Sequence, residues 1–273
     1  MGKFSGILIC TDLDGTLYKN DKTISEQNRR AIEYFKREGG LFTFITGRLP
    51  YYSMDAYRAV EPNAPFGCIN GGGVYDAERG EYVWLSKLAD EAGELVSHIE
   101  KKFPNVGIQT CCFDKTYFSK ENNVTVRFRA QTDLPNIFCP FHEVKESVAK
   151  VLFCTDIEEE IKAIERELRS HPLAYKFDFI RSEHSLFEIL PKGVHKGVSI
   201  DKMIEHLGVD RAKTVAVGDY DNDVGMLKSA GLGIAVANAS KAALDAADVV
   251  TVSNEEHAIA EVIYGIESGK YKL

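Results

Sequence analysis

The fold is decided by the stretch Thr11-Asp12-Leu13-Asp14-Gly15-Thr16-Leu17, which follows a short apolar segment near the start of the chain. Side chains alternate between the two faces of extended backbone, so Asp12 and Asp14 project the same way. Two carboxylates at the end of a buried strand are costly unless a cation lies between them. An Asp-x-Asp pair alone would suit an ordinary acidic loop, but Gly15 adds a sharp turn and Thr16 a hydroxyl to secure it. The stretch therefore predicts a strand end that binds a divalent cation and a phosphate group.

Length and composition favour a globular enzyme. The chain has 273 residues, 27% of them charged and 44% hydrophobic, and a formal net charge of −8. This length suits one large or two modest domains, and the negative charge argues against nucleic acid or an anionic membrane as the main partner. No apolar run approaches the ~18 residues of a membrane span. The six cysteines form no C-x-x-C pair, so we expect a reduced, cytoplasmic protein.

Strands and helices alternate in the first and last parts of the chain. Apolar strands are predicted at residues 6–10 and 41–45, with a helix over residues 26–37 between them. The late pattern consists of helices over 195–206, 221–230 and 241–247 and strands over 213–217, 233–236 and 249–252. Continuous apolar strands alternating with helices predict an α/β fold with a doubly wound parallel sheet. Ligands of such sheets bind beyond the carboxyl ends of the strands.

The middle of the chain has a different pattern. Shorter strands, some of them with alternating polarity, are predicted at residues 106–110, 124–128, 148–153, 176–180 and 186–189. Helices over 89–103 and 156–170 separate them. We therefore expect an inserted α+β domain over residues 82–190, and a core formed by residues 1–81 and 191–273.

Two segments with basic residues point to phosphate binding. Thr46-Gly47-Arg48 ends the second strand, where a hydroxyl and successive backbone amides favour an anion. Arg48 suits a phosphate clamp and a pair with a carboxylate equally well. Lys192 and Lys196 stand just before or at the start of a predicted helix, where a cation opposes the helix dipole and favours an anionic partner nearby.

A third segment, residues 218–223, crowds acidic groups at a strand end. Asp221 and Asn222 would serve as helix caps, but Asp219 at the strand tip has no such explanation. Asp223 adds a further carboxylate. A hard cation with oxygen ligands relieves the repulsion in such a cluster, and Mg²⁺ fits.

Together these residues resemble the Cof-type phosphatases of the haloacid dehalogenase-like hydrolase superfamily. The motifs that carry the resemblance are Asp12-Leu13-Asp14-Gly15-Thr16-Leu17, Thr46-Gly47-Arg48, Asn70-Gly71-Gly72, Lys196-Gly197 and Gly218-Asp219-x-x-Asn222-Asp223. Their order matches that of the family over essentially the whole chain. Tyr220 departs from the family, which mostly has glycine there, and this departure bears on substrate access. The resemblance implies a Rossmann-like core with a cap domain inserted between the Asn-Gly-Gly loop and the lysine.

The resemblance also implies a mechanism. We expect an Mg²⁺-dependent phosphomonoester hydrolase in which Asp12 is the nucleophile, Asp14 the general acid and base, and Lys196 a further catalytic group. The expected metal ligands are Asp12, the backbone carbonyl of Asp14, Asp219 and Asp223. The expected phosphate ligands are Thr46, Gly47, Lys196 and Asn222, with a possible substrate loop at Arg48, Asn70 and Gly71.

Three functions remain open from the sequence. The first is hydrolysis of a small phosphorylated metabolite such as a sugar phosphate, through an aspartyl-phosphate. The second is a phosphosugar mutase or a dedicated sugar-phosphate phosphatase on the same core. The third is a phospho-accepting signalling module, which also combines an acidic pocket with a lysine but lacks a large insert. The sequence leaves the exact substrate and the oligomeric state open.

Overall fold

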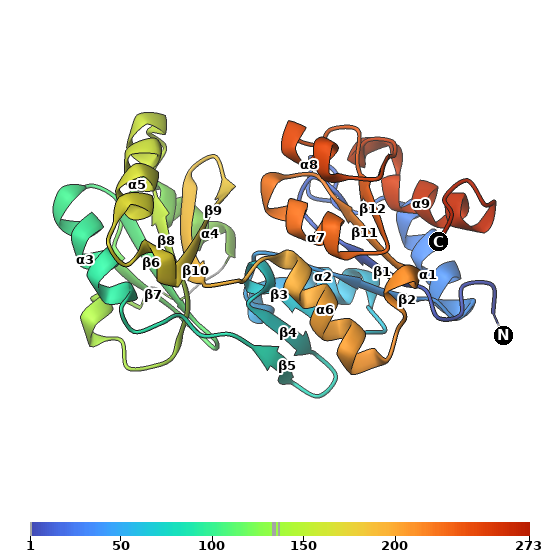
Figure 1. Cartoon of the computed structure of the whole chain (residues 1–273), viewed down its shortest axis with the longest axis horizontal. Helices are drawn as coiled ribbons and strands as arrows, with labels where there is room; N and C mark the ends of the chain where they lie inside the picture. Colours follow the sequence, from blue (N-terminus) through green and yellow to red (C-terminus); the bar gives the residue numbers. More distant parts are fainter. Residues whose placement is uncertain (1, 133–134, 136) are drawn as a thin grey trace. The chain divides into compact units, whose positions relative to one another are not determined.

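The computed structural model describes residues 2–132, 135 and 137–273 and divides into two compact units. The first unit joins Met1–Leu85 to His195–Leu273, and the second is Ser86–Val194 (Figure 1). The division falls a few residues later than the boundaries expected at 82 and 191. At the first boundary the reason is that β5 (Glu81–Leu85) pairs with β4 (Gly73–Asp76) of the first unit.

A five-stranded parallel sheet forms the centre of the first unit, in the order β13-β12-β11-β1-β2. Its strands are β1 (Leu8–Thr11), β2 (Leu41–Phe44), β11 (Thr214–Gly218), β12 (Leu232–Ala235) and β13 (Val249–Val250). All of β1, β11 and β12 is buried, which explains their continuous apolar sequences. The predicted α/β fold with a parallel sheet is confirmed. Because β1 lies between β2 and β11, the segments that follow these three strands meet at one edge.

Helices accompany this sheet in the first unit (Figure 1). They are α1 (Glu26–Arg37), α2 (Met54–Val60), α6 (Lys196–Leu207), α7 (Val224–Ser229), α8 (Lys241–Ala246) and α9 (Ala258–Glu267). Short 3₁₀ helices are η1 (Pro50–Ser53), η2 (Ile69–Gly71), η5 (Arg211–Lys213), η6 (Asp221–Asp223) and η7 (Asn254–Glu256). The helix α1 packs against α9, and α6 packs against α7. Among the described residues, no helix has the length and apolarity needed to cross a membrane.

The first unit also has a small antiparallel sheet that the sequence analysis did not predict. Its strands β3 (Phe66–Cys68), β4 and β5 lie in the order β3-β4-β5. The loop between β3 and β4 carries the Asn-Gly-Gly sequence, and α6 packs against both strands. This small sheet therefore places the loop beside the start of α6.

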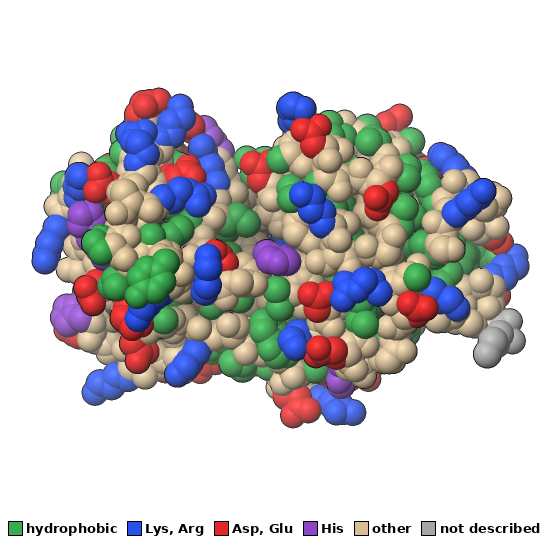
Figure 2. Space-filling view, viewed as in Figure 1, with side chains coloured by type: hydrophobic (Ala, Val, Ile, Leu, Met, Phe, Trp, Pro, Cys, Tyr) green, Lys and Arg blue, Asp and Glu red, His purple; other side chains and the backbone are tan. Residues whose placement is uncertain are grey.

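The second unit is an antiparallel sheet in the order β7-β6-β8-β10-β9. Its strands are β6 (Gly107–Cys112), β7 (Thr116–Lys120), β8 (Val148–Cys154), β9 (Phe177–Glu183) and β10 (Leu186–Pro191). The longer helices are α3 (Ala92–Lys102), α4 (Asn123–Thr132) and α5 (Glu158–Ser170), and the 3₁₀ helices are η3 (Phe141–Glu143) and η4 (Ala174–Lys176). Apolar residues of α3 and α5 share one core with β6, β8 and β10. Charged side chains of both signs lie together over α5 in Figure 2, as expected for a solvated helix face.

The strand predicted at residues 124–128 is wrong, because this segment belongs to the helix α4. Valine and threonine there favour extended structure by propensity. Asn122 overrides this preference: its Oδ1 accepts from the backbone N–H groups of Val124 at 3.1 Å and Thr125 at 3.2 Å. These bonds satisfy donors that a helix start otherwise leaves unpaired.

Candidate active site

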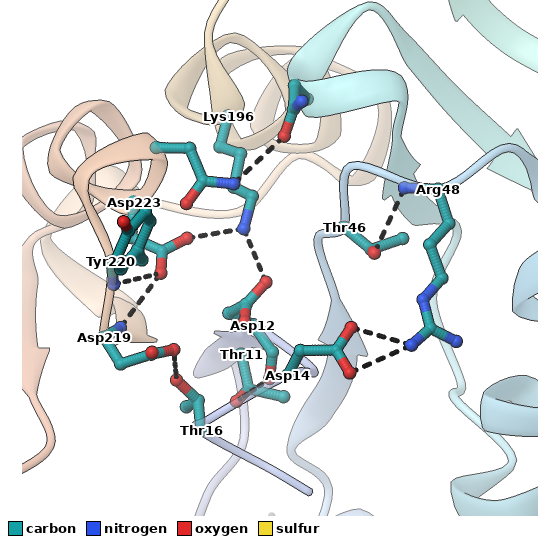
Figure 3. A network of polar contacts seen from close by, with 12 residues as sticks. Thr11, Asp12, Asp14, Thr16, Thr46, Arg48, Lys196, Asp219, Tyr220 and Asp223 are labelled. Atoms are coloured by element: carbon teal, nitrogen blue, oxygen red, sulfur yellow. Dashed lines mark hydrogen bonds and ion pairs between the residues drawn. The ribbon is translucent and has the colours of Figure 1, made fainter. Parts of the chain in front are cut away.

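Three chain segments meet around Asp12 at the carboxyl edge of the parallel sheet (Figure 3). Asp12 directly follows β1, and its backbone N–H donates to the carbonyl of Val217 in β11 at 2.8 Å. On the other side of β1, the chain leaves β2 towards Thr46, which is almost completely buried. The β1–β2 and β1–β11 pairings thus bring the Asp-x-Asp stretch next to both predicted partner segments.

Lys196 links two buried carboxylates. Its Nζ lies 2.5 Å from Asp12 Oδ1 and 2.6 Å from Asp223 Oδ1, and its side chain is 1% exposed (Figure 3). Burial alone would lower the pKa of this ammonium, but the two carboxylates outweigh it and raise the pKa above its ordinary value. Lys196 therefore stays charged at the first position of α6.

The carboxylates of Asp12, Asp219 and Asp223 form an acidic cluster in which one oxygen of each lies within 4.8 Å of the others. Burial raises the pKa of Asp12 well above its ordinary value, although Lys196 opposes the shift. Burial, together with the charge of Asp223, raises the pKa of Asp219 to about 6. A single ammonium does not offset the charge of three carboxylates, two of them buried and one partly buried. An all-oxygen cluster with excess negative charge fits a hard divalent cation such as Mg²⁺.

The loop after β11 holds this cluster in place. Asp223 Oδ2 accepts from the backbone N–H groups of Asp219 at 2.9 Å and Tyr220 at 3.0 Å. The hydroxyl of Thr16 donates to Asp219 Oδ1 at 2.6 Å. The sequence suggested only that Thr16 secures its own turn, but its hydroxyl contacts a carboxylate in the loop after the neighbouring strand β11.

Asp14 is held by two cations. Arg48 Nη2 lies 2.9 Å from Oδ1 and 2.7 Å from Oδ2, and Lys22 Nζ lies 2.9 Å from Oδ1. Burial would raise the pKa of Asp14, but Arg48 and Lys22 together hold it below its ordinary value. Arg48 was expected either to bind phosphate or to pair with a carboxylate, and in the structure it pairs with the carboxylate of Asp14. Lys22 was not foreseen, because it lies in a turn where a lysine adopts a left-handed φ of 64°, without a glycine at that position as a signal.

The predicted loop at Asn70 and Gly71 lies against the start of α6. Asn70 has a left-handed φ of 52°, and its Oδ1 accepts from Asn222 Nδ2 at 3.2 Å. A Cβ on Gly71 would lie 1.9 Å from the carbonyl oxygen of His195, so only glycine fits there. Gly47 is similarly close: its Cβ would lie 2.8 Å from Asn70 Oδ1. The structure thus gathers these residues in the first unit, whereas Lys192 lies in the second unit, with its Nζ 2.6 Å from Asp178 Oδ1.

Known proteins are similar to this chain over most of its length. The profile of the haloacid dehalogenase-like hydrolases matches residues 9–263, so the chain belongs to this family of hydrolases. Among its relatives is the 5-amino-6-(5-phospho-D-ribitylamino)uracil phosphatase YitU of Bacillus subtilis (strain 168). The two chains are 32% identical over 263 residues, which cover 94% of this chain and 96% of YitU. A second enzyme of that name from the same strain, YwtE, is 27% identical and matches 96% of this chain and 99% of its own.

Solved structures agree with this assignment. A haloacid dehalogenase-like hydrolase from Bacteroides thetaiotaomicron superimposes with a TM-score of 0.84 at 27% identity, covering 95% of this chain and 99% of its own. The expected family is therefore confirmed, and so is the expected class of enzyme, a phosphatase.

Proposed function

We propose that this protein is an Mg²⁺-dependent phosphomonoester hydrolase that acts on a small phosphorylated metabolite through an aspartyl-phosphate on Asp12. The observation that carries the proposal is the position of Lys196, whose Nζ lies between Asp12 Oδ1 and Asp223 Oδ1. A buried ammonium at this point favours the anionic, nucleophilic form of Asp12. It also supplies positive charge where a phosphoryl group would approach Asp12.

Each half of the proposed reaction uses both aspartates of the Asp-x-Asp stretch. A carboxylate oxygen of Asp12 attacks phosphorus, the bond to the ester oxygen breaks, and Asp14 gives a proton to the leaving alkoxide. Water then attacks the aspartyl-phosphate and gives a proton to Asp14, and Asp12 leaves as the carboxylate. The products are the alcohol and inorganic phosphate. Arg48 and Lys22 favour the ionised form of Asp14, which suits the second half, in which it accepts a proton.

The acidic cluster supports the proposed cofactor. Mg²⁺ would be held by the carboxylates of Asp12 and Asp219 and by the backbone carbonyl of Asp14. Both oxygens of Asp223 already have partners, which supports an orienting role for this residue or binding through water. Bound Mg²⁺ would neutralise negative charge on the phosphoryl oxygens.

We assign the remaining phosphate contacts to a hydroxyl, backbone amides and a carboxamide near Lys196. Thr46 and Gly47 follow β2, and Asn222 lies in η6 with its amide against Asn70. The loop residues Arg48, Asn70 and Gly71 would then face the substrate. These groups together would bind the phosphoryl oxygens that the cation leaves free.

The proposed substrate is a phosphorylated sugar or sugar alcohol. Support comes from YitU and YwtE, whose names give a substrate with a phosphoribityl chain and whose similarity extends over nearly the whole chain. We assign the inserted unit, Ser86–Val194, the role of a cap that contacts the leaving group. The second candidate substrate is the compound in the names of these two relatives, 5-amino-6-(5-phospho-D-ribitylamino)uracil.

A substrate panel tests the proposal. It would contain sugar phosphates, sugar-alcohol phosphates, the phosphoribitylamino-pyrimidine and nucleoside monophosphates, each with Mg²⁺. We expect release of inorganic phosphate, highest with the sugar or sugar-alcohol esters, and none from the Asp12→Asn variant. Products that keep their phosphate would identify a mutase instead, and a protein that retains phosphate without turnover would identify a signalling module.

A further inference from the structure

Two asparagine side chains donate hydrogen bonds to the loop that follows Asp14. Asn238 comes shortly after β12, and Asn254 opens η7 after β13. Asn238 Nδ2 donates to the carbonyl of Gly15 at 2.9 Å, and Asn254 Nδ2 donates to the carbonyl of Tyr18 at 3.0 Å. Segments near one edge of the sheet therefore hold the loop that follows the interior strand β1.

The two amides are also joined to each other. The backbone N–H of Asn254 donates to Asn238 Oδ1 at 2.9 Å. Asn254 is 2% exposed and also donates from Nδ2 to Asn20 Oδ1 at 3.2 Å. Both hydrogens of its side-chain amide thus have acceptors, as a buried amide requires. Replacing Asn254 would leave the carbonyl of Tyr18 without this donor.

The loop held by these two amides, residues 15–18, carries Thr16 and directly follows Asp14 of the proposed site. Thr16, which lies between the two held carbonyls, donates its hydroxyl to Asp219 Oδ1 at 2.6 Å. The backbone of Asp14 forms an isolated bridge with Tyr18, and the N–H of Tyr18 donates to the carbonyl of Leu13 at 2.8 Å. A displacement of the Tyr18 backbone would therefore also displace the backbone of Asp14.

We propose that Asn254 is a positioning residue for phosphoryl transfer, which, together with Asn238, fixes the loop at residues 15–18 and thereby Asp14. The assignment rests on the proposed function, because the position of Asp14 matters for catalysis only if Asp14 is the general acid and base. A displacement of about 1 Å in a catalytic group can cost on the order of 10²-fold in rate. Asn254 touches neither substrate nor metal in this scheme and acts only through the loop.

Asn28 provides the matched control. It is a fully buried amide whose Oδ1 accepts from the backbone N–H of Ala260 at 3.0 Å, and it thereby ties α1 to α9. Asn28→Ala and Asn254→Ala each remove one buried amide that joins two distant segments. Both variants should lower the melting temperature. Only Asn254→Ala should change catalysis.

The kinetic test compares an alkyl phosphate with an aryl phosphate in the full-length enzyme. We expect Asn254→Ala to lower kcat for the alkyl ester by roughly 10- to 100-fold, with KM nearly unchanged, and to lower kcat for the aryl ester less. An aryl leaving group needs less help from the proton of Asp14. Equal kcat losses in Asn254→Ala and Asn28→Ala would overturn the proposal.

Amide hydrogen exchange in the Mg²⁺-free protein tests the positioning itself without activity. Asn254→Ala should speed exchange at the backbone amide of Tyr18, and Asn28→Ala should not. Asn238→Ala, at an exposed position, gives the same test if the first variant does not fold. Unchanged exchange in the folded variants would refute the role of these amides. A wild-type protein that hydrolyses no ester would refute the proposed function instead, and exchange would still decide whether the amides hold the loop.

Discussion

Lys196 Nζ lies 2.5 Å from Asp12 Oδ1, although 184 positions of sequence separate the two residues. The inserted unit, Ser86–Val194, accounts for most of this separation. Asp12 is fixed by the pairing of β1 with β11, and Lys196 by the start of α6. The contact therefore reports whether both parts of the first unit are correctly assembled.

The Asp12→Asn variant should lose turnover and keep its fold. A neutral amide is a poor nucleophile at phosphorus, so we expect phosphate release to fall by at least ~10³-fold. Lys196 retains Asp223 as a partner, which should preserve the local structure. Phosphate release and circular dichroism measure the two effects, with Asp55→Asn at an exposed helix position as the control. Near wild-type activity would mean that another group is the nucleophile.

The Asp14→Asn variant should discriminate between leaving groups. An amide cannot give a proton to an alkoxide, so alkyl phosphates should suffer a larger loss, on the order of 10²–10⁴-fold. Aryl phosphates have better leaving groups and should retain more activity. The measurement is kcat for both ester types in the variant and in the wild type. Equal losses would show that Asp14 does not act as the general acid.

Chelation should abolish activity, and Mg²⁺ should restore it. Zn²⁺ should restore it poorly, because an all-oxygen cluster suits a hard, octahedral cation. Binding should also stabilise the fold, by ~2.7 kcal/mol at a concentration of 100 times Kd. Melting curves with and without Mg²⁺ measure this effect, and Asp219→Asn should reduce it. Full activity after exhaustive chelation would exclude a metal from the reaction.

Gly71→Ala should damage the site through backbone contact alone. Gly71 has a φ of 96°, and an added Cβ would lie 1.9 Å from the carbonyl oxygen of His195. Gly208, which ends α6 with a φ of 66°, has open space at its Cβ and serves as the matched control. The left-handed backbone costs each variant ~1–2 kcal/mol, and the clash adds ~1–3 kcal/mol to Gly71→Ala alone.

Urea denaturation measures the difference between the two glycine variants. Because His195 precedes the first residue of α6, Gly71→Ala should also shift Lys196 and reduce phosphate release. Gly208→Ala should keep its activity. Equal stability of the two variants would show that the backbone near His195 moves aside without cost.

Removal of the inserted unit should weaken discrimination among substrates more than it slows phosphoryl transfer itself. A chain that joins Met1–Leu85 to His195–Leu273 through a short linker retains every residue assigned to phosphoryl transfer. Contacts to the leaving group would be lost, so kcat/KM for the metabolite should fall far more than for a small aryl phosphate. Equal losses, in a variant shown to be folded, would place specificity in the loops around Arg48 and Tyr220.

The parallel sheet was predictable because its strands are buried on both faces and read as continuous apolar runs. Several local elements were not predicted, among them β7, α2 and the following two. The strands β3 and β4 are short and carry glycines, so their pattern resembles a loop. The helix α4 contains valine and threonine, and its actual start depends on a cap at Asn122. In both cases a tertiary or capping contact outweighs the hydrophobic pattern.

The proximity of the acidic residues to the proposed phosphate-binding residues was predictable, because most of them follow strands that adjoin in a parallel sheet. Residues that act through the backbone of other segments were not. Lys22 contacts Asp14 from a turn, and Asn254 donates to the carbonyl of Tyr18 across 236 positions of sequence. A single lysine or asparagine outside any motif gives no sequence pattern from which such a distant contact could be predicted.

The order of the strands bears on how the protein is made. The interior strand β1 pairs with β2 on one side and with β11 on the other, and β11 is translated only after the whole of Ser86–Val194. At ~5–20 residues per second, the nascent chain keeps one edge of β1 open for roughly ten to forty seconds. An apolar edge without a partner is a template for aggregation. We therefore expect the newly made N-terminal segment to depend on ribosome-associated chaperones until the last third of the chain emerges.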